Sequence, residues 1–133
     1  KRVVSGLNID FYYLEKSLET GETWLSDQEI SETKILSDIT VNIQITDALS
    51  SSIKEAMLAN DVVLVGDWLP YGIYEEMGAF LIRSSIDDFL SKFENIIDNF
   101  EDFKLKNKNN RDVILKFASW NSVMRDFIKR YKS

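Results

Sequence analysis

Asp47, Ser50, Ser51, Ser52 and Glu55 are the residues of this chain whose types and spacing best suit the binding of an anion. The serines stand where a helix is expected to begin, and the unpaired backbone N–H groups and dipole of a helix start favour phosphate. Serine hydroxyls can cap those N–H groups or donate to a ligand. Glu55 follows the last two serines at helical spacing, so its carboxylate could accept hydroxyls of a sugar attached to the phosphate. The plainer interpretation is an ordinary capped helix with an exposed glutamate.

The elements that position these residues follow from a change of hydrophobic period. Apolar and polar residues alternate over residues 39–45, which predicts a strand. Ile53, Ala56 and Met57 then recur at helical spacing in a segment of good helix formers, and Asn60 is a plausible C-cap. The sequence therefore predicts a strand, an acidic loop that carries Asp47, and a helix that starts with serines.

A second strand is predicted over residues 62–65, a continuous apolar run typical of a parallel strand covered on both faces. The loop 66–72 follows its C-terminal end, and ligands of open α/β sheets bind beyond the C-terminal ends of the strands. We therefore expect Trp68 and Tyr71 at the same cleft as Asp47. Their rings either stack on a base or sugar or cover the edge of the core.

Helical and strand patterns alternate along the rest of the chain. Residues 10–15 have a strand-like composition, and Ser26 with Glu29 forms a capping box for a helix that ends near residue 38. Glu75 and Glu76 are expected to open a short helix, residues 79–82 to form a strand, and the serines at 84 and 85 to cap an amphipathic helix. Residues 106–110 are predicted as a polar loop. The closing helix, about 111–132, has a predicted buried face of Ile114, Phe117, Trp120, Met124 and Phe127.

This alternation predicts an α/β fold of one domain over residues 1–133. We expect a parallel sheet of about four strands with helices on both faces.

Composition limits the chemistry that the chain can perform. Its 133 residues are 44% hydrophobic, enough for a sizeable core, and they include neither cysteine nor histidine. Disulfides, thiolate metal sites and histidine-based triads are therefore excluded, and any catalysis must use carboxylates, hydroxyls, lysine or backbone dipoles. We find no membrane-spanning apolar run and no signal peptide, and we expect a cytoplasmic protein. Because the first residue is Lys1, we expect the chain to be a fragment of a longer protein.

Charge is distributed unevenly along the chain. The net charge is −6, but residues 101–133 carry nine Lys and Arg against four Asp and Glu, which leaves −11 for the rest. The acidic whole argues against nucleic acid as a partner. The basic C-terminal third could contact the inner face of an anionic membrane. The commoner case for such a cluster is the solvated face of a terminal helix.

The order of these residues resembles the signature of retaining GT-B glycosyltransferases of the large family-four type, also called glycosyl transferases group 1. Asp47, seven intervening residues and then Glu55-Ala56-Met57 match the family's carboxylate, seven residues and Glu-Ala-Met. Residues 61–66 are similar to its next buried strand, 71–75 partly to its Gly-Gly-x-x-Glu turn, and 77–82 to its following strand. The last helix is similar to the family's closing helix.

Several positions depart from the family pattern. Asp47 replaces the glutamate that the family usually has. The family also has a glycine two or three residues after that glutamate, and here Ser50 takes its place. Asp61 replaces a proline before the second strand, and Tyr71 replaces the first glycine of the turn.

The resemblance implies that the chain is the Rossmann-like C-terminal half of a GT-B enzyme, which binds a nucleotide-sugar. The whole protein, with an N-terminal domain ahead of Lys1, would transfer a sugar from a nucleoside-diphosphate donor to a hydroxyl acceptor in polysaccharide or glycoconjugate synthesis. Asp47 would contact the donor sugar near the reacting carbon, Glu55 would bind ribose hydroxyls, and Glu75 would lie near the site. The serines would hold the diphosphate. No metal or other cofactor is implied, and the fragment alone would be inactive.

Two alternatives stay open. The departures at positions 47 and 50 are compatible with a non-catalytic glycosyltransferase-like subunit or interaction module. A receiver-like or flavodoxin-like module would share the same helix-start chemistry, although we find no convincing receiver set of acidic cluster, phosphoacceptor aspartate and lysine.

Overall fold

The computed structural model describes residues 26–132 of a chain that divides into two units, Lys1–Thr33 and Lys34–Ser133. Helix α1 (Asp27–Leu36) begins in the first unit and ends in the second. The predicted capping box is confirmed: the Ser26 N–H donates to Glu29 Oε2 at 2.8 Å, and the Glu29 N–H donates to Ser26 Oγ at 3.3 Å. These bonds from Ser26 lower the pKa of Glu29. The strand-like residues 10–15 lie outside the described residues.

The second unit contains a parallel sheet of three strands in the order β1-β2-β3, formed by β1 (Ile39–Asn42), β2 (Val62–Gly66) and β3 (Ile82–Ser84). Ile39 lies opposite Val62 and Leu64 opposite Ile82. The predicted mixed α/β class with a parallel sheet is therefore confirmed for residues 26–132. β1 is shorter than predicted, because Ile43 and Ile45 lie past its end with 49% and 91% of their surfaces exposed.

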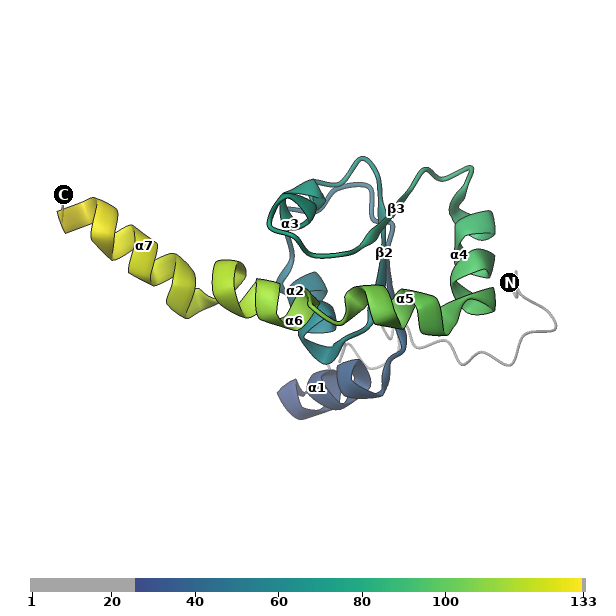
Figure 1. Ribbon diagram of the computed structural model, residues 1–133, viewed down its shortest axis with the longest axis horizontal. Coiled ribbons are helices and arrows are strands. Elements are labelled where there is room, and N and C mark those ends of the chain that lie inside the picture. Colours follow the sequence, from purple (N-terminus) through teal and green to yellow (C-terminus); the bar gives the residue numbers. More distant parts are fainter. Residues whose placement is uncertain (1–25, 133) are drawn as a thin grey trace, which may run out of the picture. The chain divides into compact units, whose positions relative to one another are not determined.

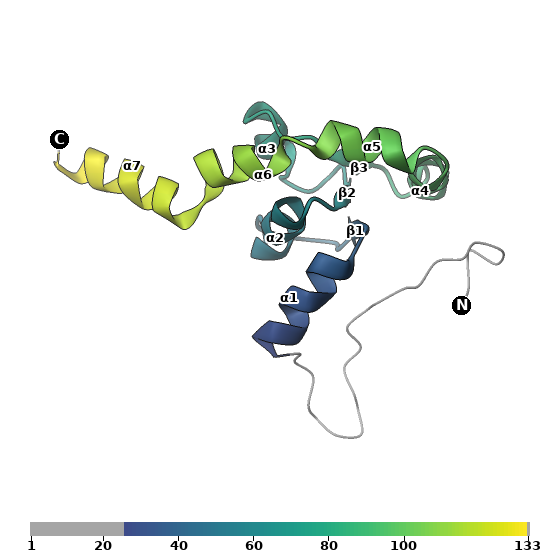
Figure 2. The same ribbon diagram turned by 60° about the horizontal axis from the view of Figure 1, so that its bottom comes forward.

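Helices cover both faces of β2. Figures 1 and 2 show α2 (Ser51–Ala59) and α3 (Gly72–Glu76) on one side of this strand and α4 (Phe89–Asp98) on the other. Side chains alternate along a strand, so Val63 and Val65 join the core cluster built by α2 and α3. Val62 and Leu64 point to the opposite face and are also fully buried. Burial on both faces explains the unbroken apolar run of β2.

The predicted polar loop 106–110 is reduced to an exposed turn at Lys108 and Asn109, between α5 (Phe100–Asn107) and α6 (Asn110–Val113). Asn107 and Asn110, which flank this turn, are buried. Asn110 accepts the Phe80 N–H and donates to the Phe80 carbonyl, each at 2.6 Å. Asn107 Nδ2 donates to the Asp61 carbonyl at 2.6 Å. The polar side chains are buried because they pair backbone groups that would otherwise be unsatisfied.

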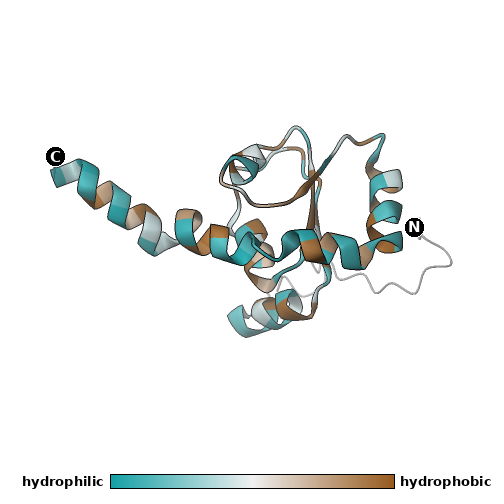
Figure 3. Ribbon diagram, in the orientation of Figure 1, coloured by the Kyte–Doolittle hydropathy of each residue, from teal (hydrophilic) through white to brown (hydrophobic). Residues whose placement is uncertain are grey.

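The predicted closing helix is interrupted. A π-helical segment, η1 (Ile114–Ala118), follows α6, and Ser119 is extended with φ −71° and ψ 151° before α7 (Trp120–Lys132) begins. Of the predicted buried face, Ile114 is buried, whereas Phe117, Trp120 and Phe127 are 42%, 77% and 61% exposed. Figure 3 shows hydrophobic and hydrophilic bands alternating along α7.

Three further boundaries differ from the prediction. Glu75 and Glu76 end α3 instead of opening it, because the helix already begins at Gly72. β3 begins at Ile82, at the end of the predicted strand. α4 begins at Phe89, because Ser85 first forms a turn in which its Oγ accepts the Asp88 N–H at 3.2 Å.

Candidate functional site

The start of α2 offers backbone N–H groups that its N-cap side chain does not satisfy. Ser50 is the N-cap, with φ −55° and ψ 146°, and its hydroxyl makes no capping hydrogen bond. At the other end Asn60 adopts the left-handed conformation with φ 68°, and its N–H reaches the last carbonyls of the helix. The predicted C-cap is therefore confirmed. At the N-terminal end, the Ser50 side chain satisfies none of the N–H groups of the first turn.

An open pocket of about 320 Å³ lies where β1 ends and α2 begins. It is lined by Val41, Asn42, Ile43, Gln44, Ser50 and Ser52. Its volume is at the lower end of the range for small-molecule sites. Ser50 and Ser52 are the predicted site residues that line it.

Asp47 is held beside this pocket by two side chains from other elements. Asn42, the last residue of β1, donates from Nδ2 to Asp47 Oδ2 at 2.5 Å and to the Tyr71 hydroxyl at 3.2 Å. The Tyr71 hydroxyl donates a short hydrogen bond to the same Asp47 oxygen. Ser50 Oγ lies 3.4 Å from the Tyr71 oxygen. These four residues form one hydrogen-bonded group, the Asp47 cluster, which reaches the pocket through Asn42 and Ser50.

Electrostatics within the Asp47 cluster favour an ionised aspartate beside a neutral phenol. Partial burial acts to raise the pKa of Asp47, but hydrogen bonds from Tyr71, Asn42 and the backbone N–H groups of Ala48 and Ser50 outweigh it and lower this pKa. Burial and the neighbouring carboxylate raise the pKa of Tyr71. Asp47 therefore carries its negative charge at neutral pH while Tyr71 keeps its proton.

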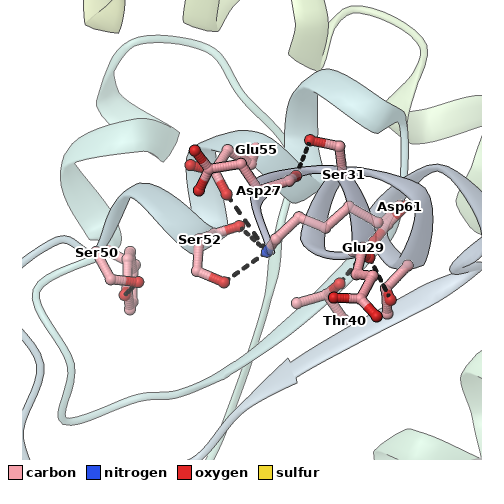
Figure 4. Close-up of polar contacts among 11 residues, drawn as sticks. Asp27, Glu29, Ser31, Thr40, Ser50, Ser52, Glu55 and Asp61 are labelled. Carbon is pink, nitrogen blue, oxygen red and sulfur yellow. Dashed lines mark hydrogen bonds and ion pairs between the residues drawn. The ribbon is translucent and has the colours of Figure 1, made fainter. Parts of the chain in front are cut away.

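Lys34 brings a cation to the first turn of α2, which we did not predict. Its Nζ donates to the Ser52 carbonyl at 2.8 Å and to Ser52 Oγ at 2.5 Å, and it lies 3.8 Å from Glu55 Oε2 (Figure 4). Burial lowers the pKa of Lys34, and the charges of Glu55 and Asp61 oppose this shift. Figure 4 shows Glu55 directed toward this contact, and Glu55 does not line the pocket.

The other predicted residues are placed in different ways. Trp68 is 40% exposed, and its Nε1 donates to the carbonyl of Gln44, a residue that lines the pocket, at 2.9 Å. Of the two alternatives for Tyr71, the structure shows the second: its ring is fully buried against Tyr74, and its hydroxyl joins the Asp47 cluster. Glu75 lies 3.8 Å from Arg83 and Ser51 is exposed, and neither lines the pocket.

Leu49 has a positive φ of 61° in the loop between Asp47 and α2. The left-handed conformation costs a residue with a Cβ about 1–2 kcal/mol, so glycine is its usual occupant. The loop therefore keeps a glycine-like backbone without a glycine.

Asn42 and Lys34 are the residues of this region that sequence reasoning missed. Asn42 had a signal, since it is a polar residue near the C-terminal end of a predicted strand, where ligands of α/β sheets bind. Lys34 had none beyond its charge, because its partner Ser52 is 18 residues away.

Within residues 26–132, no three or more His, Cys, Asp or Glu side chains gather where they could hold a metal ion. The helices of the same range are too short or too polar to cross a membrane.

Comparison of the chain with protein-family models, with curated proteins and with solved structures finds no match. The likeness to GT-B glycosyltransferases therefore remains a prediction from its residues.

Proposed function

We propose that this chain binds the diphosphate of a nucleoside-diphosphate-sugar at the first turn of α2. In this proposal it is the Rossmann-like, donor-binding part of a glycosyltransferase that moves a sugar to a hydroxyl acceptor. The observation that carries the proposal is the start of α2, where Ser50 makes no side-chain capping hydrogen bond and lines the pocket together with Ser52. A helix start of this kind attracts phosphate through its N–H groups and its dipole.

Each residue has a role that its surroundings support. The hydroxyls of Ser50 and Ser52 donate to phosphate oxygens, and Lys34 adds positive charge beside Ser52. Asp47 faces the donor sugar, as the family resemblance implies. Glu55 has 47% of its side chain exposed and its ion pair with Lys34 is 3.8 Å long, so ribose hydroxyls can compete for its oxygens. Helix dipole and hydrogen-bond donors offset the charge of the leaving diphosphate.

A non-catalytic interaction module is the second candidate. Both acidic residues of the signature have partners within the chain, Asp47 through Tyr71 and Glu55 through Lys34. A polar group that is satisfied internally needs no ligand to be stable.

Thermal unfolding in the presence of UDP, GDP, ADP or FMN tests the binding step. A ligand at about 100 times its Kd stabilises the folded chain by about 2.7 kcal/mol. We expect one nucleoside diphosphate to raise Tm, and the combined Ser50→Ala and Ser52→Ala variant to weaken this effect several-fold. Ser91→Ala, on α4, is the matched control. Stabilisation by FMN alone would favour a flavodoxin-like module, and no stabilisation by any nucleotide would contradict donor binding.

Sugar transfer by the whole protein separates the enzyme from the non-catalytic module. Asp47→Ala should abolish transfer and Glu55→Ala should raise the donor KM. Full activity in both variants would remove these two residues from the site.

A further inference from the structure

Helix α7 is amphipathic along its whole length. At helical spacing its apolar residues fall on one stripe, and its charged residues fall on the rest of the surface. The stripe is formed by Trp120, Val123, Met124, Phe127, Ile128 and Tyr131. Four basic residues, Arg125, Lys129, Arg130 and Lys132, accompany a single acidic one, Asp126.

The fold of residues 26–132 does not cover this stripe. Trp120 is 77%, Phe127 61% and Tyr131 84% exposed, and the last two rings stack on each other at 6.3 Å. The one buried residue of α7 is Ser122, which lies on the polar side and donates from Oγ to the Lys116 carbonyl of η1. α7 therefore meets η1 through its polar side and keeps its apolar side outward.

We propose that α7 docks on an anionic lipid surface, with its apolar stripe among the acyl chains and its basic residues at the headgroups. Its 13 residues span about 20 Å, too short to cross a bilayer but long enough to lie in the interface. Trp120 and Tyr131, at its two ends, are the aromatic types that favour the membrane interface. Four basic charges complement anionic headgroups.

Charge also favours lipid over a second copy of the chain as the partner of the apolar stripe of α7. Two α7 helices packed through their stripes would bring two sets of Arg125, Arg130 and Lys132 together, because at helical spacing these three residues flank the stripe, whereas Lys129 lies opposite it. Anionic lipid neutralises these charges instead, and lysine and arginine stems can extend along the apolar surface toward the headgroups. The net charge of −11 for residues 1–100 disfavours contact of that part with the same surface. This inference does not depend on the proposed donor site.

Vesicle co-sedimentation of the full chain tests the proposal. We expect binding to vesicles of phosphatidylcholine with about one third phosphatidylserine, weak binding to phosphatidylcholine alone, and release at high salt. Phe127→Ser with Tyr131→Ser should lower the partition coefficient more than tenfold, and Lys129→Glu with Lys132→Glu should do the same. Lys108→Glu with Arg111→Glu reverses as many charges outside α7 and should lower it less than threefold.

Three results would overturn the proposal. These are failure to bind anionic vesicles, equal losses in the α7 charge variant and its control, and self-association that Phe127→Ser with Tyr131→Ser abolishes while vesicle binding is unchanged. Circular dichroism and Tm of each variant check that the exposed substitutions leave the fold intact.

Discussion

Asp47 lies beyond the C-terminal end of β1 and Asp61 immediately precedes β2, so the two carboxylates mark opposite ends of the parallel sheet. Each accepts a hydrogen bond from a hydroxyl, Asp47 from Tyr71 and Asp61 from Thr40 at 2.6 Å (Figure 4). Asp47 is partly exposed and its pKa is lowered. Asp61 is fully buried, and burial raises its pKa against the opposing effects of Thr40, Ser37, Lys104 and Lys34.

The difference shows that similar contacts leave a charge near water at one end of the sheet and hold buried segments together at the other. Around Asp61, hydrogen bonds join segments that are far apart in the sequence. Lys104 Nζ donates to the Asn60 carbonyl at 2.6 Å, and Asn107 Nδ2 donates to the Asp61 carbonyl. Around Asp47 the donors come from residues that line a pocket or adjoin it. A charge kept near water can meet a ligand, whereas a buried one is held by the fold.

The largest effect is expected at the buried end. Asn107→Ala removes the partner of the Asp61 carbonyl and leaves a cavity, so it should lower the unfolding free energy by about 2–4 kcal/mol. Asn109→Ala, an exposed asparagine two residues on, should change it by less than about 0.5 kcal/mol. Urea unfolding measures both. Equal losses would show that the buried contact is not what stabilises this end.

A smaller effect is expected at the open end. Tyr71→Phe keeps the buried ring but removes a hydrogen bond to a carboxylate, and it should cost about 1–2 kcal/mol and raise the pKa of Asp47. Tyr74→Phe is the matched control, because its ring is also buried and the pKa of its hydroxyl is raised by burial and by the charges of Tyr71 and Asp47, with no hydrogen bond among the causes. NMR titration of the Asp47 carboxyl and urea unfolding test the pair. An unchanged pKa would remove Tyr71 from the role of positioning Asp47.

The smallest effects are expected in the pH dependence, with opposite signs at the two ends. The raised folded pKa of Asp61 means that the wild type loses stability as the pH rises from the unfolded value of 3.8 through that raised pKa. Asp61→Asn lacks this loss. The stability of this variant relative to the wild type should therefore increase as the pH rises from 3.8 through the raised folded pKa.

Asp47 contributes stability that is present above its unfolded pKa of 3.8 and is lost as the pH falls through the lowered folded value. Asp47→Asn should therefore be less stable than the wild type at neutral pH, by at most about 1 kcal/mol for a partly exposed group, and should approach it in acid. Urea unfolding across this pH range measures both variants. If the stability differences of both variants from the wild type changed with pH in the same direction, Asp47 and Asp61 would not differ in the way described.

Elements with local signals could be predicted from the sequence. The capping box at Ser26, the C-cap at Asn60 and the buried run of β2 each depend on a few neighbouring residues, and all three are confirmed. The serines at the start of α2 were found in the same way, and two of them line the pocket.

Features that depend on distant partners could not be predicted. Asn107 and Asn110 look like loop residues, but their partners are 46 and 30 residues away, and Asn42 meets Tyr71 across 29 residues. The π-helical η1 leaves the helical pattern of the sequence almost unchanged, so nothing indicated the break before α7. The burial of Tyr71 likewise depends on Tyr74 and the core around it.

Gly66 has no Cβ, and the Trp68 indole fills the space beside it. A Cβ on residue 66 would lie only 2.5 Å from the nearest carbon of that ring. The same indole donates to the Gln44 carbonyl at the pocket wall. Occupation of the pocket would therefore alter the surroundings of a fluorophore that the chain already carries. The fluorescence of Trp68 is obtained by subtracting the spectrum of the Trp68→Phe variant from that of the wild type. It would report ligand binding in the pocket without an added label.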